Sequence, residues 1–193
     1  MKHGNLDIII DKFTSCLEDA NGNLYDTVVY QVEESNILKG YNRTTGWKAN
    51  WKLLYKKGFK IFALALKDSP LVFQGLVAVY NDYEAGVTIL DWAVANPKNV
   101  PYMNKGKKDY FGVGGHLFAI ALEESIRAGF GGVIIGHPSN RKLNEHYIEK
   151  LHAKPFNYGP LADGYQYTII LAGMDARYVY EKYNFESIDK IKK

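Results

Sequence analysis

The stretch KDYFGVGGHLFAIALEESIRAGFGGVIIGHPSNRKLNEHYIEKL, residues 108–151, decides the fold. It contains a glycine turn, a helix-forming segment, a second glycine turn, a short apolar strand, a loop and a further helix. Gly129 is suited to end the first helix because glycine adopts the left-handed conformation without steric cost. The helical spacing predicts one buried face and an opposite face with Glu123, Glu124 and Arg127. The buried face comprises Leu117, Phe118, Ala121, Leu122, Ser125 and Ile126.

The first glycine turn, Gly112 to Gly115, runs directly into this helix. The first N–H groups of a helix have no partner within it and lie at the positive end of its dipole. They form a cradle for an anion, and a phosphate group suits it best. A purely structural tight turn is the alternative, because glycine is common wherever φ must be positive.

The end of the stretch places Asn140 seven residues before Tyr147. Together with the glycine turn, helix and strand, this order resembles the acyl-CoA-binding core of GNAT-superfamily N-acetyltransferases. That core begins with an Arg/Gln-x-x-Gly-x-Gly/Ala loop, whose two small residues align with Gly112 and Gly114. The sequence departs from the pattern in two places. Asp109 stands where the motif has Arg or Gln, with Lys105, Lys107 and Lys108 as alternative cations, and the usual Gly-Phe ending after the tyrosine is absent.

The resemblance implies an α+β fold: a GNAT-like central mixed, mostly antiparallel sheet flanked by helices in three α/β/α layers. Residues 1–193 would form a single domain, with the acyl-CoA-binding core at about residues 87–151. The expected cosubstrate is acetyl-CoA. Its pyrophosphate would bind the turn and first helical N–H groups, and its pantetheine arm would pair with backbone at the end of the fourth strand. The residues concerned are Gly112, Val113, Gly114, Gly115 and His116 for the pyrophosphate, and Ala93, Val94 and Ala95 for the arm.

By the same resemblance, Tyr147 would be the catalytic acid that protonates the departing thiolate, with packing on the sheet as the alternative. Asn140 would either hold the pantetheine arm or cap the following helix. Asp91 is the candidate base, although a structural aspartate sharing a strand face with Ile89 and Ala93 is equally compatible. His137 and His146 lie close in sequence to the site, and a structural role is favoured for both.

The function implied is N-acetyl transfer from acetyl-CoA to a primary amine, directly within a ternary complex. The amine acceptor is unidentified, and a homodimer is compatible with the resemblance. A non-catalytic GNAT-like module that binds acyl-CoA or a protein partner is the alternative, because of Asp109 and the altered ending. A third reading, an unrelated nucleotide-binding module, is disfavoured because neither a P-loop lysine nor a dinucleotide acidic partner is present.

Upstream of the core, residues 59–66, 71–80 and 87–94 predict an antiparallel three-strand meander. Two earlier segments, residues 6–13 and 24–32, predict strands joined in a hairpin around the turn at residues 19–23. A helix ending at Gly58 carries an aromatic stripe with Trp47 and Trp51 that either packs the core or, with Tyr41, lines an acceptor pocket. The link at residues 95–108 is long enough to be a mobile cover or a surface insertion.

Downstream, residues 165–171 predict a strand and residues 175–183 a final helix. The charged tail at residues 187–193 is expected to fray.

The composition excludes several classes of function. The chain has 193 residues and a net charge of +3, and its basic residues are spread along the sequence, so nucleic-acid binding is not implied. The absence of a long apolar run argues against a membrane span. The lone cysteine, Cys16, excludes an internal disulfide and favours a cytoplasmic location. Cys16 also lies far from the core motif, so no covalent acyl-enzyme is expected, and no metal-binding spacing of histidines is present.

Overall fold

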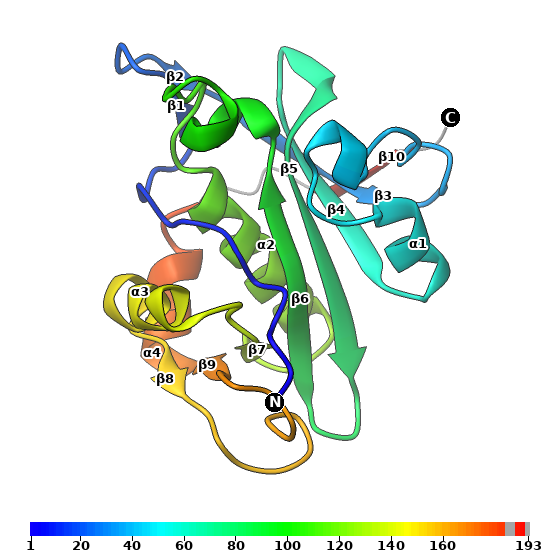
Figure 1. The fold of residues 1–193 in the computed structure, drawn as a ribbon, viewed down its shortest axis with the longest axis vertical. Helices are drawn as coiled ribbons and strands as arrows, with labels where there is room; N and C mark the ends of the chain where they lie inside the picture. Colours follow the sequence, from blue (N-terminus) through cyan, green and yellow to red (C-terminus); the bar gives the residue numbers. More distant parts are fainter. Residues whose placement is uncertain (184–187, 192–193) are drawn as a thin grey trace.

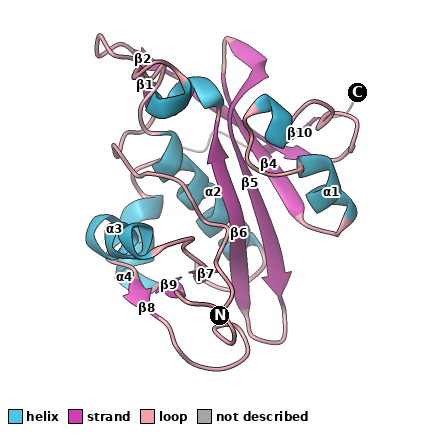
Figure 2. Cartoon of the chain, in the orientation of Figure 1, coloured by secondary structure: helices cyan, strands magenta, loops and turns pink. Residues whose placement is uncertain are grey.

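The computed structural model describes residues 1–183 and 188–191. Within them, a mixed sheet runs in the order β10-β3-β4-β5-β6-β7-β9-β8 (Figures 1 and 2). Its strands are β3 Thr27–Val32, β4 Lys60–Leu66, β5 Ser69–Asp82, β6 Val87–Ala95, β7 Ile134–Gly136, β8 Lys154–Pro155, β9 Ile169–Leu171 and β10 Ile188–Ile191. The pairs β10–β3 and β6–β7 are parallel and the others are antiparallel. The mixed, mostly antiparallel sheet expected from the sequence is therefore observed.

The predicted meander of β4, β5 and β6 forms the centre of the sheet. These strands are apolar on both faces because helices cover both sides, which gives the three expected layers. One core packs under α2 (Val113–Arg127), α3 (Arg141–Leu151) and α4 (Gly173–Tyr180). The other packs under the short helix α1 (Trp51–Lys56) and contains Trp47 and Trp51, so core packing is the alternative that the structure shows for these two residues. The helix is shorter than predicted, because Trp47 precedes it and it ends at Lys56.

Helix α2 carries the chain across the sheet from β6 to β7, which therefore lie parallel. Its expected apolar face is buried, with one exception: Ile126 is 43% exposed, beside the last turn of the helix. Glu124, expected on the solvent face, is instead 4% exposed. Its carboxylate accepts from Asn81 Nδ2 at 2.7 Å and pairs with Lys60 Nζ at 2.5 Å, which satisfies the buried charge.

The predicted hairpin of residues 6–13 with residues 24–32 is wrong. The turn at residues 19–23 joins two short strands, β1 (Leu17–Glu18) and β2 (Leu24–Tyr25), which form a separate small sheet. β3 pairs with β4, while Leu6 forms an isolated parallel bridge with Pro138. The N-terminal segment is extended, as its alternation predicts, but it lies beside the chain that follows β7 and not beside β3.

Two downstream elements differ from their predicted bounds: the strand is shorter, and the final helix begins and ends earlier. The strand expected at residues 165–171 is reduced to β9, because Tyr165 to Thr168 follow a loop and bond to the N-terminal segment and to Phe156. Helix α4 begins at Gly173 and ends at Tyr180. Of the tail expected to fray, residues 188–191 form β10 beside β3, while residues 187, 192 and 193 lie outside the described part of the chain.

Candidate functional site

Strands β6 and β7 separate at Asp91. Their parallel pairing covers Thr88 to Leu90 on β6 and ends there. The pairing of β6 with β5 shifts register at the same place, since Leu90 faces Val79 whereas Trp92 faces Ala78, which leaves Asp91 as the extra residue of a bulge. Strict alternation therefore fails, and Asp91 does not share a face with Ala93 as the sequence pattern suggested. Beyond the bulge, one edge of Ala93, Val94 and Ala95 pairs with β5 and the other faces the opening between the strands.

The glycine turn lies at the mouth of this opening. Gly112 has φ 90° and forms the N-cap of α2. The His116 N–H, expected among the phosphate donors, is bonded to the Gly112 carbonyl at 3.2 Å as the first bond of the helix. It is therefore not available for a phosphate, and the cradle is limited to Gly112 and the first turn. Gly115 has a packing role as well, because a Cβ there would overlap the hydroxyl of Tyr183.

The structure buries Tyr147 completely, at 0% exposure, on the inner face of α3. Its hydroxyl donates to the Ile8 carbonyl at 2.8 Å and accepts from the Ile8 N–H at 3.1 Å. Burial raises the pKa of the Tyr147 phenol well above its ordinary value, against a smaller opposing effect of the bond to Ile8. The phenol is consequently protonated at neutral pH, and its proton is held by the N-terminal segment.

That segment, residues 4–12, is called the N-terminal strap below. It runs through the opening between β6 and α3 (Figure 1). Leu6, Ile8 and Ile10 point inward and are at most 6% exposed, while Ile9 is 48% exposed. The Leu6 N–H donates to the His137 carbonyl at 3.1 Å, and the Leu6 carbonyl accepts from Ser139 at 3.0 Å. The strap thus occupies the backbone hydrogen-bonding groups of His137 and Ser139, in the chain that follows β7.

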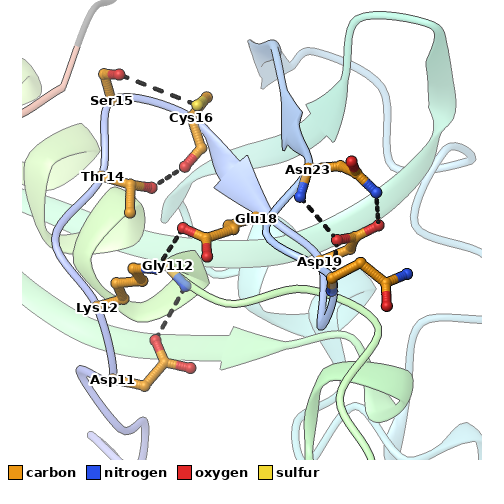
Figure 3. A network of polar contacts seen from close by, with 10 residues as sticks. Asp11, Lys12, Thr14, Ser15, Cys16, Glu18, Asp19, Asn23 and Gly112 are labelled. Atoms are coloured by element: carbon orange, nitrogen blue, oxygen red, sulfur yellow. Dashed lines mark hydrogen bonds and ion pairs between the residues drawn. The ribbon is translucent and has the colours of Figure 1, made fainter.

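The strap ends with an anion in the glycine turn. Asp11 Oδ1 accepts from the Gly112 N–H at 3.0 Å, as Figure 3 shows, and Oδ2 pairs with Lys108 Nζ at 2.6 Å. The Asp11 side chain is 17% exposed. A carboxylate at this position is stabilised by the positive end of α2. One donor of the predicted anion cradle, the Gly112 N–H, is therefore occupied by a carboxylate of the chain itself.

Two predicted site residues have other local partners. The side chain of Asn140 accepts from the Leu143 N–H at 3.0 Å, which makes it the N-cap of α3. Asp109, at the position of the motif's cation, is exposed and accepts from Asn104 Nδ2 at 3.2 Å. Lys108, beside it, supplies the cation that reaches the glycine turn.

Asp91 is partly buried at the point where the strands separate. Burial raises the pKa of its carboxyl, while a hydrogen bond from Asn5 Nδ2 at 3.4 Å and the charge of Lys57 oppose the rise. A carboxyl with a raised pKa is a better proton acceptor than an exposed aspartate. The strap contacts this residue too, through Asn5.

The two histidines of the site are neutral. His146 Nε2 accepts from the Ile10 N–H at 2.9 Å, and burial, assisted by nearby lysines, lowers the pKa of its imidazole. His137 stacks on Tyr165 with ring centroids 3.7 Å apart, and burial lowers its pKa to about 4. Both side chains position neighbouring elements, in line with the structural role that was favoured.

A cavity of about 140 Å³ remains between the strap and the end of β6. Ile8 and Ile9 line one side, and Val94 and Ala95 line the other. The long link forms its cover, with two 3₁₀ turns, η2 (Pro97–Asn99) and η3 (Pro101–Met103). Asn99 fastens the link, because its side chain bonds to Gln74 at 3.0 Å and to the Tyr110 N–H at 2.9 Å.

The arrangement joins an antiparallel meander, a glycine turn that opens the crossover helix and a parallel strand that leaves the sheet's centre. This order of elements agrees with the GNAT-like arrangement that the sequence resemblance implies. No protein-family model matches the sequence, and no curated protein is significantly similar to it. Among solved structures, the ribosomal-protein-S18-alanine N-acetyltransferase from Escherichia coli is similar at 15% identity and a TM-score of 0.47. The similarity covers 77% of this chain and 97% of that chain.

Among the described residues, no helix has the length and apolar character needed to cross a membrane.

Sequence reasoning missed Asp11 and the strap. The alternation of Leu6, Ile8 and Ile10 was visible, but it indicated only an extended segment with one buried face. The signal that bears on the site is Asp11 itself, an acid one residue beyond the buried alternation. Its partner is 101 positions away in the sequence, so no local pattern could identify the pair.

Proposed function

We propose that the protein is an acyl-CoA-dependent N-acyltransferase that uses acetyl-CoA to acylate a primary amine, directly within a ternary complex. The observation that carries the proposal lies where the diverging strands β6 and β7 meet the start of α2. There the Gly112 N–H and Lys108 already hold an anion, the Asp11 carboxylate. A pyrophosphate makes the same kind of contacts at a helix N-terminus.

In this proposal, Gly112, Val113, Gly114 and Gly115 hold the pyrophosphate. The free edge of Ala93 to Ala95 pairs with the pantetheine arm and orients the thioester carbonyl between β6 and α3. Asn140 contributes indirectly, by capping the helix that carries Tyr147. Acetyl-CoA is a substrate here, and the protein's role is to bind and orient it and to move two protons.

The proposed reaction forms one bond and breaks one. The amine nitrogen attacks the carbonyl carbon of the thioester, a C–N bond forms, and the C–S bond breaks with its electron pair going to sulfur. Asp91, directly or through water, takes the proton that the amine loses, and Tyr147 donates a proton to the thiolate. The raised pKa of the Tyr147 phenol keeps it protonated before the reaction starts. The raised pKa of the Asp91 carboxyl strengthens its affinity for the amine proton.

A second candidate function follows from the strap. A GNAT-like module whose cleft stays filled by its own chain would bind a protein partner without catalysis. The bonds from Leu6, Ile8 and Asp11 to the cleft favour it. The two candidates differ in whether acetyl-CoA can enter the cleft at all.

The test is a binding and turnover measurement on the full chain. Thermal unfolding is followed with and without millimolar acetyl-CoA, for the wild type and for Asp109→Arg, which adds a cation near the cradle. Occupancy at about a hundred times Kd adds roughly 2.7 kcal/mol, which raises Tm by about 5–10 °C for a domain of this size. Thiol release is then measured with a panel of polyamines, peptide N-termini and aromatic amines.

The expected result is a Tm shift that is larger for Asp109→Arg than for the wild type, and amine-dependent thiol release. Asp68→Arg, in the exposed turn before β5, is the matched control for the added charge. If acetyl-CoA shifts Tm in no variant, including the strap variants described next, the acyltransferase proposal fails and the non-catalytic module remains.

A further inference from the structure

The N-terminal strap contacts each part of the site proposed above. Asn5 bonds to Asp91, Ile8 to Tyr147, and Asp11 to the glycine turn. Ile8 and Ile9 line the cavity opposite Val94 and Ala95. We propose that the strap is an intramolecular inhibitor of the acyl-CoA site, in which the Asp11 carboxylate occupies the phosphate position. This inference rests on the proposed function.

The first argument is electrostatic. The Asp11 carboxyl group accepts from the Gly112 N–H with one oxygen and from Lys108 Nζ with the other. A phosphate oxygen would require the same donor and the same cation. Two anions cannot share one N–H group and one ammonium without strong repulsion, because the site is partly shielded from solvent. Binding of a pyrophosphate therefore requires Asp11 to leave.

The second argument is steric. A Cβ on Gly114 would overlap the carbonyl oxygen of Ile9, so the strap backbone lies directly against the first turn of α2. A Cβ on Gly4 would likewise overlap the carbonyl of His137, at the opposite end of the strap. No layer of ligand fits between the strap and these two places. Because a cavity of only about 140 Å³ remains between the strap and the end of β6, the pantetheine arm and the strap exclude each other.

The third argument concerns how the strap is held. Its pairing with the sheet is a single bridge at Leu6 rather than a ladder. Only three of its larger side chains are buried, and the residues before it, Met1 to His3, are exposed. Ahead of the strap, the Lys2 backbone bonds to Gly164 and Gln166. A segment without a strand ladder and with few buried side chains belongs to the part of a structure that opens first. The strap can therefore detach while the sheet and helices stay folded.

Binding of acetyl-CoA and release of the strap are then coupled. If acetyl-CoA binds only when the strap is out, each lowers the affinity of the cleft for the other by the same factor. The apparent affinity for acetyl-CoA is reduced by the fraction of molecules with the strap in place. Weakening the strap without altering the cradle should raise that affinity.

Two full-length variants test the effect of charge and the effect of steric exclusion separately. Asp11→Asn keeps the shape of the side chain but removes its charge, and so weakens the pair with Lys108. Gly4→Ala places a methyl group against the His137 carbonyl at the other end of the strap, outside the residues proposed to bind acetyl-CoA. Asp68→Asn, in an exposed turn, is the control for the change in net charge. Inorganic pyrophosphate and acetyl-CoA are the two probes, and Kd is measured by calorimetry.

The expected result is a Kd for acetyl-CoA at least fivefold lower in Asp11→Asn and Gly4→Ala than in the wild type, with Asp68→Asn unchanged. The Kd for pyrophosphate should also be lower in Asp11→Asn than in the wild type. Hydrogen exchange gives the direct readout. The amides of Leu6, Ile8 and Ile10 should lose protection when acetyl-CoA binds, while the Ala63 amide within β4 should keep it.

The outcomes distinguish this inference from the function on which it rests. Tight acetyl-CoA binding to the wild type, with strap amides still protected, overturns the inhibitor and leaves the acyltransferase standing. Pyrophosphate binding that tightens in Asp11→Asn, without acetyl-CoA binding in any variant, supports a strap that guards an anion site and refutes the acyltransferase. Equal Kd values for both probes in all four proteins refute the strap's role.

Discussion

Replacing Tyr147 with phenylalanine should change binding and turnover in opposite directions. Its hydroxyl holds both backbone groups of Ile8, at 2.8 and 3.1 Å. The same hydroxyl supplies the proton in the proposed reaction. The substitution leaves the ring in the core, where it packs on Phe118 with centroids 5.2 Å apart, so the helix is expected to stay in place.

The magnitude follows from the two lost bonds. A neutral hydrogen bond contributes about 1 kcal/mol net, so the docked strap loses about 2 kcal/mol relative to the released strap. That is a factor of about thirty in the docking equilibrium. Affinity for acetyl-CoA should therefore rise by up to about thirtyfold. Turnover should fall by about a hundredfold or more, because that is the usual contribution of a general acid.

The assay is calorimetry for binding, together with single-turnover thiol release at saturating acetyl-CoA and amine. Tyr55→Phe is the matched control, since that hydroxyl donates to the Glu33 carbonyl on the opposite side of the sheet. It should change neither quantity. A variant that binds acetyl-CoA more weakly would show that the hydroxyl does not hold the strap against the ligand. Unchanged turnover across pH would remove Tyr147 as the acid.

Three further predictions concern stability. Burial lowers the pKa of His116 to about 4 from 6.5. As pH falls, the unfolded chain binds this proton first, so the His116 contribution to the free energy of unfolding should drop by about 2 kcal/mol between pH 7 and 5. His137, whose pKa is also lowered to about 4, adds a drop of its own. His116→Phe should therefore reduce the pH dependence seen in urea titrations without abolishing it, and an equal slope would contradict the prediction. Glu124→Ala leaves the Asn81 amide buried without its acceptor and should lower the free energy of unfolding by about 3 kcal/mol, visible as a lower urea midpoint. Asn140→Ala removes a cap and should lower Tm by about 3 °C with unchanged acetyl-CoA affinity, whereas a weaker affinity would give Asn140 a contact with the ligand.

The sheet's centre could be predicted because its signals are local. The three central strands, the glycine turn and α2 each depend on neighbours within a few residues, and their predicted bounds agree with the structure to within about two residues. The anion cradle stays a prediction, and one of its donors, the Gly112 N–H, bonds to Asp11. Asn140 was recognised with two alternatives, and the geometry of α3 selects the cap.

What could not be predicted depends on pairing over long distances. The alternation of residues 6–13 is the same whether its partner is β3 or the chain after β7, and only the whole fold decides between them. The bulge at Asp91 likewise leaves no trace in the β6 sequence, so its effect on alternation was missed. Glu124 was placed on the solvent face because its partners, Asn81 and Lys60, lie on other strands.

The strap also has a consequence for how the molecule is made. Its residues are made before their partners, which lie 86 to 139 positions later in the chain. Closing loops of that length is entropically costly and slow, so the strap waits until α3 has been synthesised. The nascent domain therefore passes through a stage in which strands β3 to β6 are present and its cleft is open. The strap is made before these strands, yet it docks after them.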